Sequence, residues 1–109
     1  MVKNNRVITF NKSPFIIAEI SANHNNSIKR TLKMVREAKK AGADAIKLQT
    51  YTAESMTLNT RKSQFIIKDK KSLWFNSSLF DLYKKGALPM SYYKEIFKEA
   101  KRNNIICFS

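Results

Sequence analysis

The sequence predicts an α/β fold in which parallel strands alternate with helices. Two apolar runs, residues 15–20 and 44–50, flank a stretch with helical spacing, and a third run, residues 105–108, follows a second helical stretch. Strands that are joined through a helix are parallel, and the connection between them is right-handed. The 109 residues include only 2 Gly and 2 Pro, which leaves little turn punctuation for an all-β fold.

The first half of the chain carries the sharpest element boundaries. Residues 6–10 predict a short strand, and residues 21–26 form a polar loop after the strand at 15–20. Ser27 is a plausible N-cap for the first helix, and Gly42 lies just past its end as the C′ residue. The positions at helical spacing between these two residues are Ile28, Leu32, Val35, Ala38 and Lys39.

Residues 51–89 form a connection that is long for a strand-to-helix link in an α/β protein. They include a short extended piece at 64–67 and a short helix that starts near residue 78 and ends at Gly86. Such a loop at the carboxyl edge of parallel strands is usually functional. The helix that follows opens at Pro89 and Ser91, and its predicted core positions are Tyr92, Ile96, Phe97 and Ala100.

This order of elements is the opening of an α/β barrel or of a doubly wound sheet. The third strand has no helix after it to cover its face. We therefore expect the sequence to be the N-terminal portion of a longer protein.

Charge and cysteine content narrow the class of protein. Lys and Arg total 21 against 8 Asp and Glu, a net charge of +13, but the basic residues are scattered and form no nucleic-acid motif. We therefore expect no nucleic-acid partner. The first six residues are not followed by a long apolar run, and no run is long enough for a membrane span, so we expect no signal peptide and a cytoplasmic protein. Cys107, the single cysteine, excludes an internal disulfide and is predicted to be a buried small hydrophobe.

Glu19 and Lys47 are the candidate site residues that the pattern itself indicates. Each is a charge near the carboxyl end of an apolar strand, and the alternation of side chains places Lys47 on one face with Gln49. A charge in a strand that is expected to be buried on both faces is costly unless it is paired or used. The pattern leaves two interpretations open: a structural ion pair between neighbouring strands, and a functional site.

Distinctive runs lie at both ends of the chain. They are FIIAEI at residues 15–20, NHN at 23–25, AGADAIKLQTYT at 41–52 and IICFS at 105–109. These runs resemble the sialic acid synthase family, and the LQTYT run together with LFDLY at 79–83 is most similar to its pseudaminic acid synthase branch. Residues 86–93 depart from that branch, which often has a His-Thr-Pro run there, so the identity of the acceptor sugar stays open.

The resemblance implies a TIM (β/α)8 barrel, of which this chain would be the incomplete N-terminal portion. That portion comprises about three parallel strands, two main helices and a long insertion between the second strand and the second main helix. Residues 1–109 would then be a partial segment of the barrel domain, without the remaining barrel and without the family's C-terminal antifreeze-like domain. Family members are homodimers in which that domain reaches the partner's site. The 109-residue chain alone is expected to be inactive.

The resemblance also implies a reaction. Family members join phosphoenolpyruvate to an N-acetylated hexose, release phosphate and form a nine-carbon 2-keto acid. A divalent metal, typically manganese, polarises the sugar aldehyde. The metal ligands of the family come later in the barrel, so no metal ligand is expected among these residues.

Four residues receive roles from the resemblance. Glu19 matches a catalytic glutamate that contacts sugar hydroxyls and handles a proton, and Lys47 matches a lysine at the phosphate or carboxylate of phosphoenolpyruvate. A point-charge donor suits a compact anion. Gln49 matches a sugar-binding position, and Asn76 lies near a loop asparagine that contacts the sugar. Ser109 lies just before a family threonine that binds phosphate.

Two further interpretations concern His24 and the function of the chain. His24, the single histidine, is expected to shape its loop by hydrogen bonds rather than to bind a metal. The sequence also allows two alternatives to a synthase. One is a basic α/β module that binds acidic polymers, and the other is an inactive truncated reading frame. The first of these would show strongly salt-dependent binding.

Overall fold

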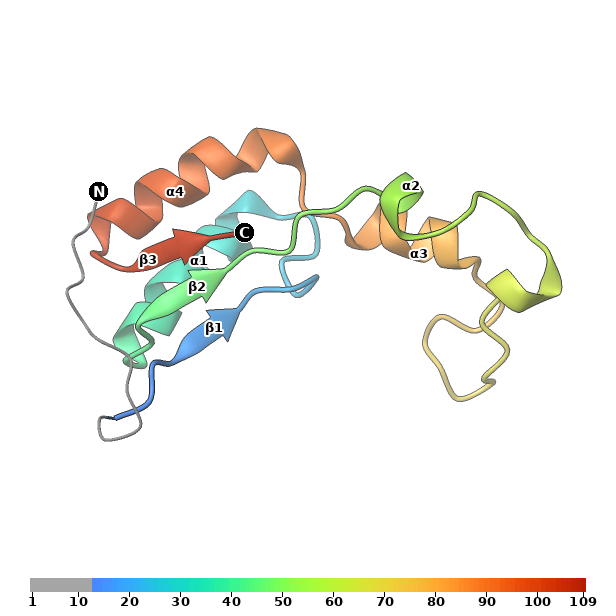
Figure 1. Cartoon of the computed structure of the whole chain (residues 1–109), viewed down its shortest axis with the longest axis horizontal. Helices are drawn as coiled ribbons and strands as arrows, with labels where there is room; N and C mark the ends of the chain where they lie inside the picture. The colour runs from blue at the N-terminus through green and yellow to red at the C-terminus, as the bar shows by residue number, and fades with distance from the viewer. Residues whose placement is uncertain (1–12) are drawn as a thin grey trace.

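The computed structural model describes residues 13–109, so the strand predicted at residues 6–10 lies outside the described residues. Within this range the predicted strands and main helices occur in the predicted order (Figure 1). They are β1 (Ile17–Glu19), α1 (Ile28–Lys40), β2 (Ala45–Lys47), α2 (Ala53–Met56), η1 (Ser63–Phe65), α3 (Leu79–Gly86), η2 (Met90–Tyr92), α4 (Tyr93–Arg102) and β3 (Ile106–Phe108), where η marks a short 3₁₀ helix.

The three strands form a parallel sheet in the order β1-β2-β3. Both crossover helices, α1 and α4, pack on the same face, because right-handed connections between successive strands in this order place their helices on one side. The expectation that the strands are buried on both faces is therefore wrong for the described chain. On the opposite face, Ile17 is 45% exposed and Lys47 is also exposed.

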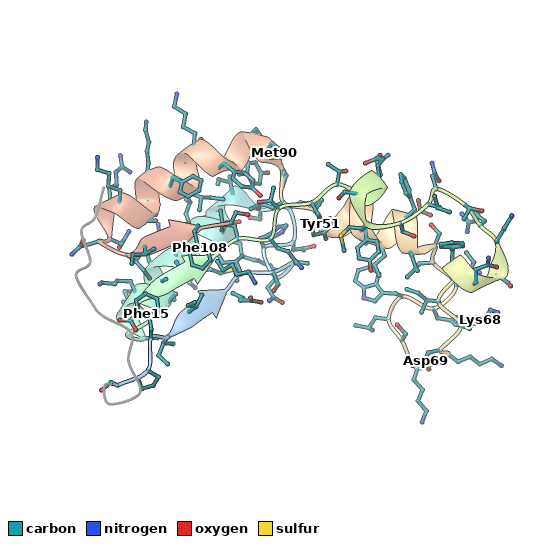
Figure 2. The ribbon with its side chains drawn as sticks, viewed as in Figure 1. Phe15, Tyr51, Lys68, Asp69, Met90 and Phe108 are labelled. Carbon is teal, nitrogen blue, oxygen red and sulfur yellow. The ribbon has the colours of Figure 1, made fainter. Side chains whose placement is uncertain are left out.

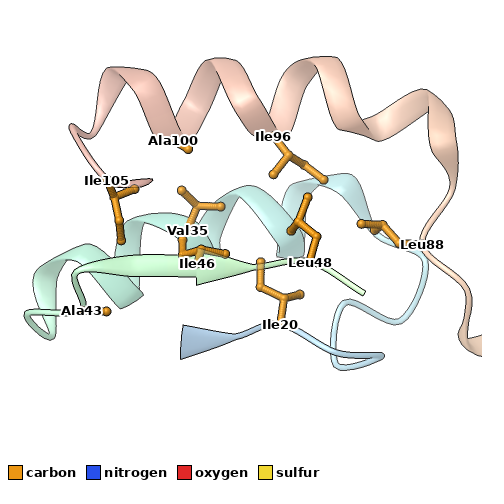
Figure 3. Packing of buried hydrophobic residues seen from close by; sticks show 9 residues of the cluster. All are labelled: Ile20, Val35, Ala43, Ile46, Leu48, Leu88, Ile96, Ala100 and Ile105. Carbon is orange, nitrogen blue, oxygen red and sulfur yellow. The ribbon is translucent and has the colours of Figure 1, made fainter. Parts of the chain in front are cut away.

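The covered face forms the hydrophobic core (Figure 3). Val35 of α1, Ile46 of β2 and Ile96 of α4 have no exposed surface and meet between the sheet and the two helices. Ile20 and Leu48 extend this cluster toward the carboxyl ends of the strands. Burying one such side chain stabilises a fold by roughly 1.5–3 kcal/mol, so this layer fixes the positions at which β1 and β2 end.

Helix α1 begins and ends as the sequence predicts. The Ser27 side chain accepts a hydrogen bond from the Arg30 backbone N–H at 3.2 Å, which caps the first turn. At the other end Gly42 has φ +89°, and the N–H of Gly42 and of Ala43 donate to the carbonyls of Lys39 and Ala38, each at 3.0 Å. This pair of bonds is the Schellman motif, which needs the left-handed conformation that glycine adopts without strain.

The predicted core positions of the two main helices are buried or partly buried, with two exceptions. Lys39 of α1 is exposed, and Phe97 of α4 is 41% exposed. Ile96 and Ala100 already turn toward the sheet, and a residue one position further along a helix is rotated by about 100° away from that face. Phe97 instead packs its ring against Tyr93, with 6.3 Å between ring centroids.

Residues 51–87, called the excursion below, leave the body of the molecule at the carboxyl end of β2 (Figure 1). They carry α2, η1 and α3. The extended piece predicted at 64–67 is only partly present: η1 occupies its first half, and Ile66 then forms an isolated antiparallel bridge with Ser78. Helix α2 was not predicted; it forms because Thr52 and Ser55 make a reciprocal capping box.

Candidate active site

Glu19 and Lys47 are the last residues of two neighbouring parallel strands and are register partners. Their side chains therefore leave the sheet on the same face, and Lys47 Nζ donates to Glu19 Oε1 at 2.7 Å. The two side chains remain 49% and 56% exposed. An ion pair this exposed adds little to stability, at most about 1 kcal/mol, so structural pairing alone does not explain the two charges.

Gln49 continues the same face of β2 two residues beyond Lys47. A small recess at the carboxyl ends of the strands is lined by Glu19, Ser21, Lys47, Leu48 and Gln49. The structure thus brings together three of the four predicted site residues. Ser21, which follows β1, has φ +49°, a conformation that is strained for a residue other than glycine and that often occurs at functional sites.

Asn76, the fourth predicted site residue, lies apart from the other three. It sits in the excursion with φ +63°, and its backbone N–H donates to the Ile67 carbonyl at 2.9 Å. Its side chain does not line the recess. Nor does it line a larger cavity of about 340 Å³ beside the recess, which Tyr51, Trp74 and Tyr83 of the excursion line. Asparagine adopts this left-handed backbone more readily than most residues, which gives Asn76 a local role in the turn. Its predicted contact with the sugar stays a prediction.

His24 shapes the loop between β1 and α1, as the sequence predicts. Its side chain is 1% exposed, and Nδ1 accepts a hydrogen bond from the Asn26 backbone N–H at 3.0 Å. Among the described residues, Nε2 has no hydrogen-bond partner. Burial lowers the pKa of His24, and an interaction with the backbone of Gly86 raises it by less. The pKa of His24 therefore lies below its usual value, because the ring is buried between the loop and the end of α3.

Three hydroxyl groups that the sequence did not indicate gather beside these strand ends. Thr50 Oγ1 lies 2.6 Å from Tyr93 Oη and also hydrogen-bonds to Ser109 Oγ. Ser109 Oγ donates to the Leu48 carbonyl at 3.3 Å. Hydroxyls can donate to the oxygens of an anion. Thr50 could have been predicted as part of the site, because it directly follows Gln49 at the end of the strand. Tyr93 could not, because it lies on a helix.

Metal-binding groups are not part of this arrangement. The described residues contain no group of three or more His, Cys, Asp or Glu side chains that could hold a metal ion. Cys107 packs half-buried against the core, and burial raises the pKa of its thiol to about 11. It packs as a small hydrophobe, as predicted, but it is only partly buried.

The fold and site together define a class. Parallel strands whose crossover helices share one face, with charged side chains at the strand carboxyl ends, are typical of α/β enzymes that bind ligands at that edge. Residues 34–109 match the NeuB family, which is more than half of the sequence. The chain belongs to the NeuB family, which confirms the family expected from the sequence.

Characterised relatives carry names within the same group of synthases. The chain is 50% identical over 98 residues to pseudaminic acid synthase of Campylobacter jejuni subsp. jejuni, covering 90% of the chain and 28% of that protein. It is 40% identical over 96 residues to pseudaminic acid synthase of Helicobacter pylori, covering 88% and 28%. N,N'-diacetyllegionaminic acid synthase of Campylobacter jejuni is 28% identical over 99 residues. The chain thus spans less than a third of the length of these relatives.

A solved structure supports the fold. The crystal structure of N-acetylneuraminic acid (sialic acid) synthetase from Leptospira borgpetersenii, in complex with citrate, superimposes with a TM-score of 0.65 at 24% sequence identity. The match covers 94% of this chain and 32% of that one. The three parallel strands and their helices therefore resemble part of a sialic acid synthase fold of the TIM-barrel type, as the sequence predicted. In the described residues, no helix is both long and apolar enough to cross a membrane.

Proposed function

We propose that this chain supplies Glu19, Lys47 and Gln49 to the active site of a nonulosonic acid synthase, which joins phosphoenolpyruvate to an N-acetylated hexose with release of phosphate. One observation carries the proposal: the 2.7 Å pair of Lys47 and Glu19 lies exposed at the carboxyl ends of adjacent parallel strands. Relatives of the chain that are named pseudaminic acid synthase, at 50% and 40% identity, favour the pseudaminic branch of the family.

The exposed pair suits two substrates at once. The Lys47 ammonium is a point charge that binds a phosphate or carboxylate oxygen of phosphoenolpyruvate. When the phosphoenolpyruvate anion neutralises part of the Lys47 charge, Lys47 holds Glu19 less tightly. The Glu19 carboxylate can then accept a hydrogen bond from a sugar hydroxyl or hold a proton. Two substrates held over neighbouring strands, roughly 5 Å apart, are in position for the enol carbon to attack the sugar aldehyde. Water then adds at C2, and phosphate leaves by C–O cleavage.

Three parts of the proposal rest on the resemblance alone. Manganese is expected for the reaction, but the described residues offer no ligand set for it, so no step here is derived through the metal. A homodimer and the role of Asn76 in sugar binding are also carried over from the family. The residues of this chain that the proposal uses are the three that the recess brings together.

Replacing Lys47 by Met tests the proposal directly. We expect phosphoenolpyruvate binding, measured by isothermal titration calorimetry on the 109-residue chain, to weaken about 10- to 100-fold, because a hydrogen bond to a charged group contributes roughly 1.5–3 kcal/mol. The melting temperature should change little, since an exposed ion pair is worth at most about 1 kcal/mol.

Glu19→Gln is the matched control. It removes the other charge of the pair while keeping the side-chain shape, and the phosphoenolpyruvate affinity should be unchanged or higher. Equal affinities for Lys47→Met and the unaltered chain would remove Lys47 from the phosphoenolpyruvate site. A large loss of stability in Lys47→Met would instead assign the pair a structural role.

A further inference from the structure

Ser21 has a backbone conformation that its residue type does not explain. Among residues 13–109, the positive φ values outside glycine belong to Ser21 and to asparagines, which are Asn25, Asn26, Asn76 and Asn104. Asparagine is enriched in this left-handed region, whereas serine is not. Glycine would adopt the φ of +49° at position 21 without the clash of a Cβ, so serine at this position lowers the stability of the fold.

The fold itself makes no use of the Ser21 hydroxyl. Other hydroxyl side chains of the chain cap helices, as those of Ser27 and Thr52 do. Within the described residues, the Ser21 hydroxyl forms no hydrogen bond to another residue. A residue that is strained and has no local partner is typical of a functional position, because local structure does not account for it.

Ser21 lines the recess together with the three predicted site residues. The recess lies at the carboxyl edge of the sheet, which Figure 2 marks at Phe108, the register partner of Lys47. Its volume is about 30 Å³. This is close to the volume of one water molecule in the liquid, so the recess admits one small group of a ligand, such as an oxygen atom.

Hydrogen-bond donors outnumber acceptors around this space. The Lys47 ammonium has three N–H groups, one of which donates to Glu19. The Gln49 amide adds two N–H groups, and the Ser21 hydroxyl adds an O–H. Glu19 can only accept, and one of its oxygens already receives the bond from Lys47. These donors suit a ligand oxygen that carries negative charge and no hydrogen, because charge-assisted hydrogen bonds are about twice as strong as neutral ones.

We propose that Ser21 is a binding residue of the site, whose hydroxyl donates to an anionic oxygen of phosphoenolpyruvate that Lys47 also contacts. This contact explains why serine rather than glycine occupies a strained position in the recess. The inference rests on the proposed function, because it places the same anion at Lys47. It adds a donor from the end of β1 to a ligand that the proposed function holds from β2 alone.

Two substitutions at position 21 separate the hydroxyl from the backbone strain. Ser21→Gly removes both, and the melting temperature should rise by about 2–6 °C because glycine relieves the left-handed strain. Ser21→Ala removes the hydroxyl but keeps the Cβ, so the melting temperature should not rise. In isothermal titration calorimetry on the 109-residue chain, both variants should bind phosphoenolpyruvate about tenfold more weakly, or weaker still.

Asn104→Gly is the matched control. Asn104 has φ +50°, lies exposed after α4 and does not line the recess. Its replacement changes another left-handed residue to glycine, and the affinity for phosphoenolpyruvate should be unchanged. Full affinity in Ser21→Ala would overturn the proposal, even if Ser21→Gly binds weakly, because the backbone and not the hydroxyl would then matter. A melting temperature that does not rise in Ser21→Gly would remove the strain on which the argument depends and would also overturn it.

Phosphoenolpyruvate has anionic oxygens on its phosphate and on its carboxylate, and two smaller anions distinguish them. Inorganic phosphate and pyruvate are each titrated into the unaltered chain and into Ser21→Ala. A loss of affinity for phosphate alone assigns the Ser21 contact to the phosphate group, and a loss for pyruvate alone assigns it to the carboxylate. If neither anion loses affinity, the hydroxyl contacts no anionic oxygen and the proposal is wrong.

The result is distinguishable from failure of the proposed function. If Lys47→Met weakens phosphoenolpyruvate binding but Ser21→Ala does not, the role of Ser21 alone is wrong. If inorganic phosphate binds in a Ser21-dependent way but phosphoenolpyruvate does not bind, the hydroxyl does contact an anion and the synthase role is wrong. If the chain binds none of the three anions, both proposals are overturned.

Discussion

The body of the molecule and the excursion are held together by different physical means. In the body, helices α1 and α4 bury Val35, Ile46 and Ile96 completely against one sheet face. No residue of the excursion, 51–87, belongs to that core cluster, and Leu73 within it is 97% exposed. The excursion buries only two apolar side chains, Ala53 of α2 and Phe80 of α3, and is otherwise held by local hydrogen bonds and ring contacts. Stability resides in the body, whereas the excursion shapes the cavity beside the site.

Few direct links join the two regions. The Asn26 side chain donates to the Lys85 carbonyl at 2.9 Å. Gly86 at the end of α3 packs near Ala22 and Tyr51. Segments with few buried apolar contacts open at low free energy cost. The comparison therefore predicts that substitutions in the two regions affect different measurements.

The largest difference is expected from truncating a core side chain. Ile46→Ala in β2 should lower the free energy of unfolding by about 2–5 kcal/mol, because it leaves a cavity in a layer with no exposed surface. The matched substitution in the excursion, Leu73→Ala, should stay within about 0.5 kcal/mol. Urea unfolding followed by circular dichroism measures both. Similar costs at the two positions would mean that the excursion contributes to one common core.

The sequence predicts the body well for the same reason that the body is stable. Its apolar spacing, the Ser27 cap and Gly42 are signals that burial and backbone geometry impose directly on residue choice. The errors arose where this rule is incomplete: Phe97 fits the helical period yet lies beside the buried stripe, and Thr31 is fully buried because its hydroxyl donates to the Ser27 carbonyl at 2.9 Å. That both helices cover the same face of the sheet could not be predicted from the apolar spacing, because the spacing does not show on which side of the sheet each helix packs.

The candidate site was predictable only where it lies on the strands. Strand alternation indicated Glu19 and Lys47, and the register pairs them. Alternation placed Gln49 on the face of Lys47, and the resemblance to the family gave it a role. The aromatic cavity was not predicted, because Tyr51, Trp74 and Tyr83 are far apart in an aperiodic segment. Their positions depend on turns such as the Ile66–Ser78 bridge, which leave no periodic signal in the sequence.

The two glycines of the chain give the next largest contrast, one in each region. Gly42 in the body has φ +89° and open space around a Cβ, so Gly42→Ala should cost about 1–2 kcal/mol through backbone strain alone. Gly86 in the excursion has no positive φ, but a Cβ would meet Tyr51 Oη at 2.9 Å. Gly86→Ala should therefore leave the free energy of unfolding within about 1 kcal/mol of the original.

Tryptophan emission should give the opposite order for the glycine variants. Because the added methyl group displaces the Tyr51 ring, Gly86→Ala should change the emission of Trp74, which lines the same cavity, whereas Gly42→Ala should keep it. If Gly86→Ala destabilises the chain as much as Gly42→Ala does, the end of α3 is part of the stable body. The separation of the two regions would then have to be drawn elsewhere.

The smallest effect is expected from acidification, through the histidine that lies between the two regions. Burial lowers the pKa of His24 from its usual 6.5, so the folded chain binds this proton less readily than the unfolded chain. The stability that neutral His24 contributes is therefore fully present above about pH 6.5 and is lost as the pH falls toward the lowered pKa. The sequence contains 1 His, so melting temperatures at about pH 7.5 and pH 5.5 report mainly on this residue. His24→Gln keeps a polar side chain that does not titrate, and its melting temperature should fall less over the same interval. An equal fall in both proteins would place the acid-sensitive group elsewhere and leave His24 with its role in the loop alone.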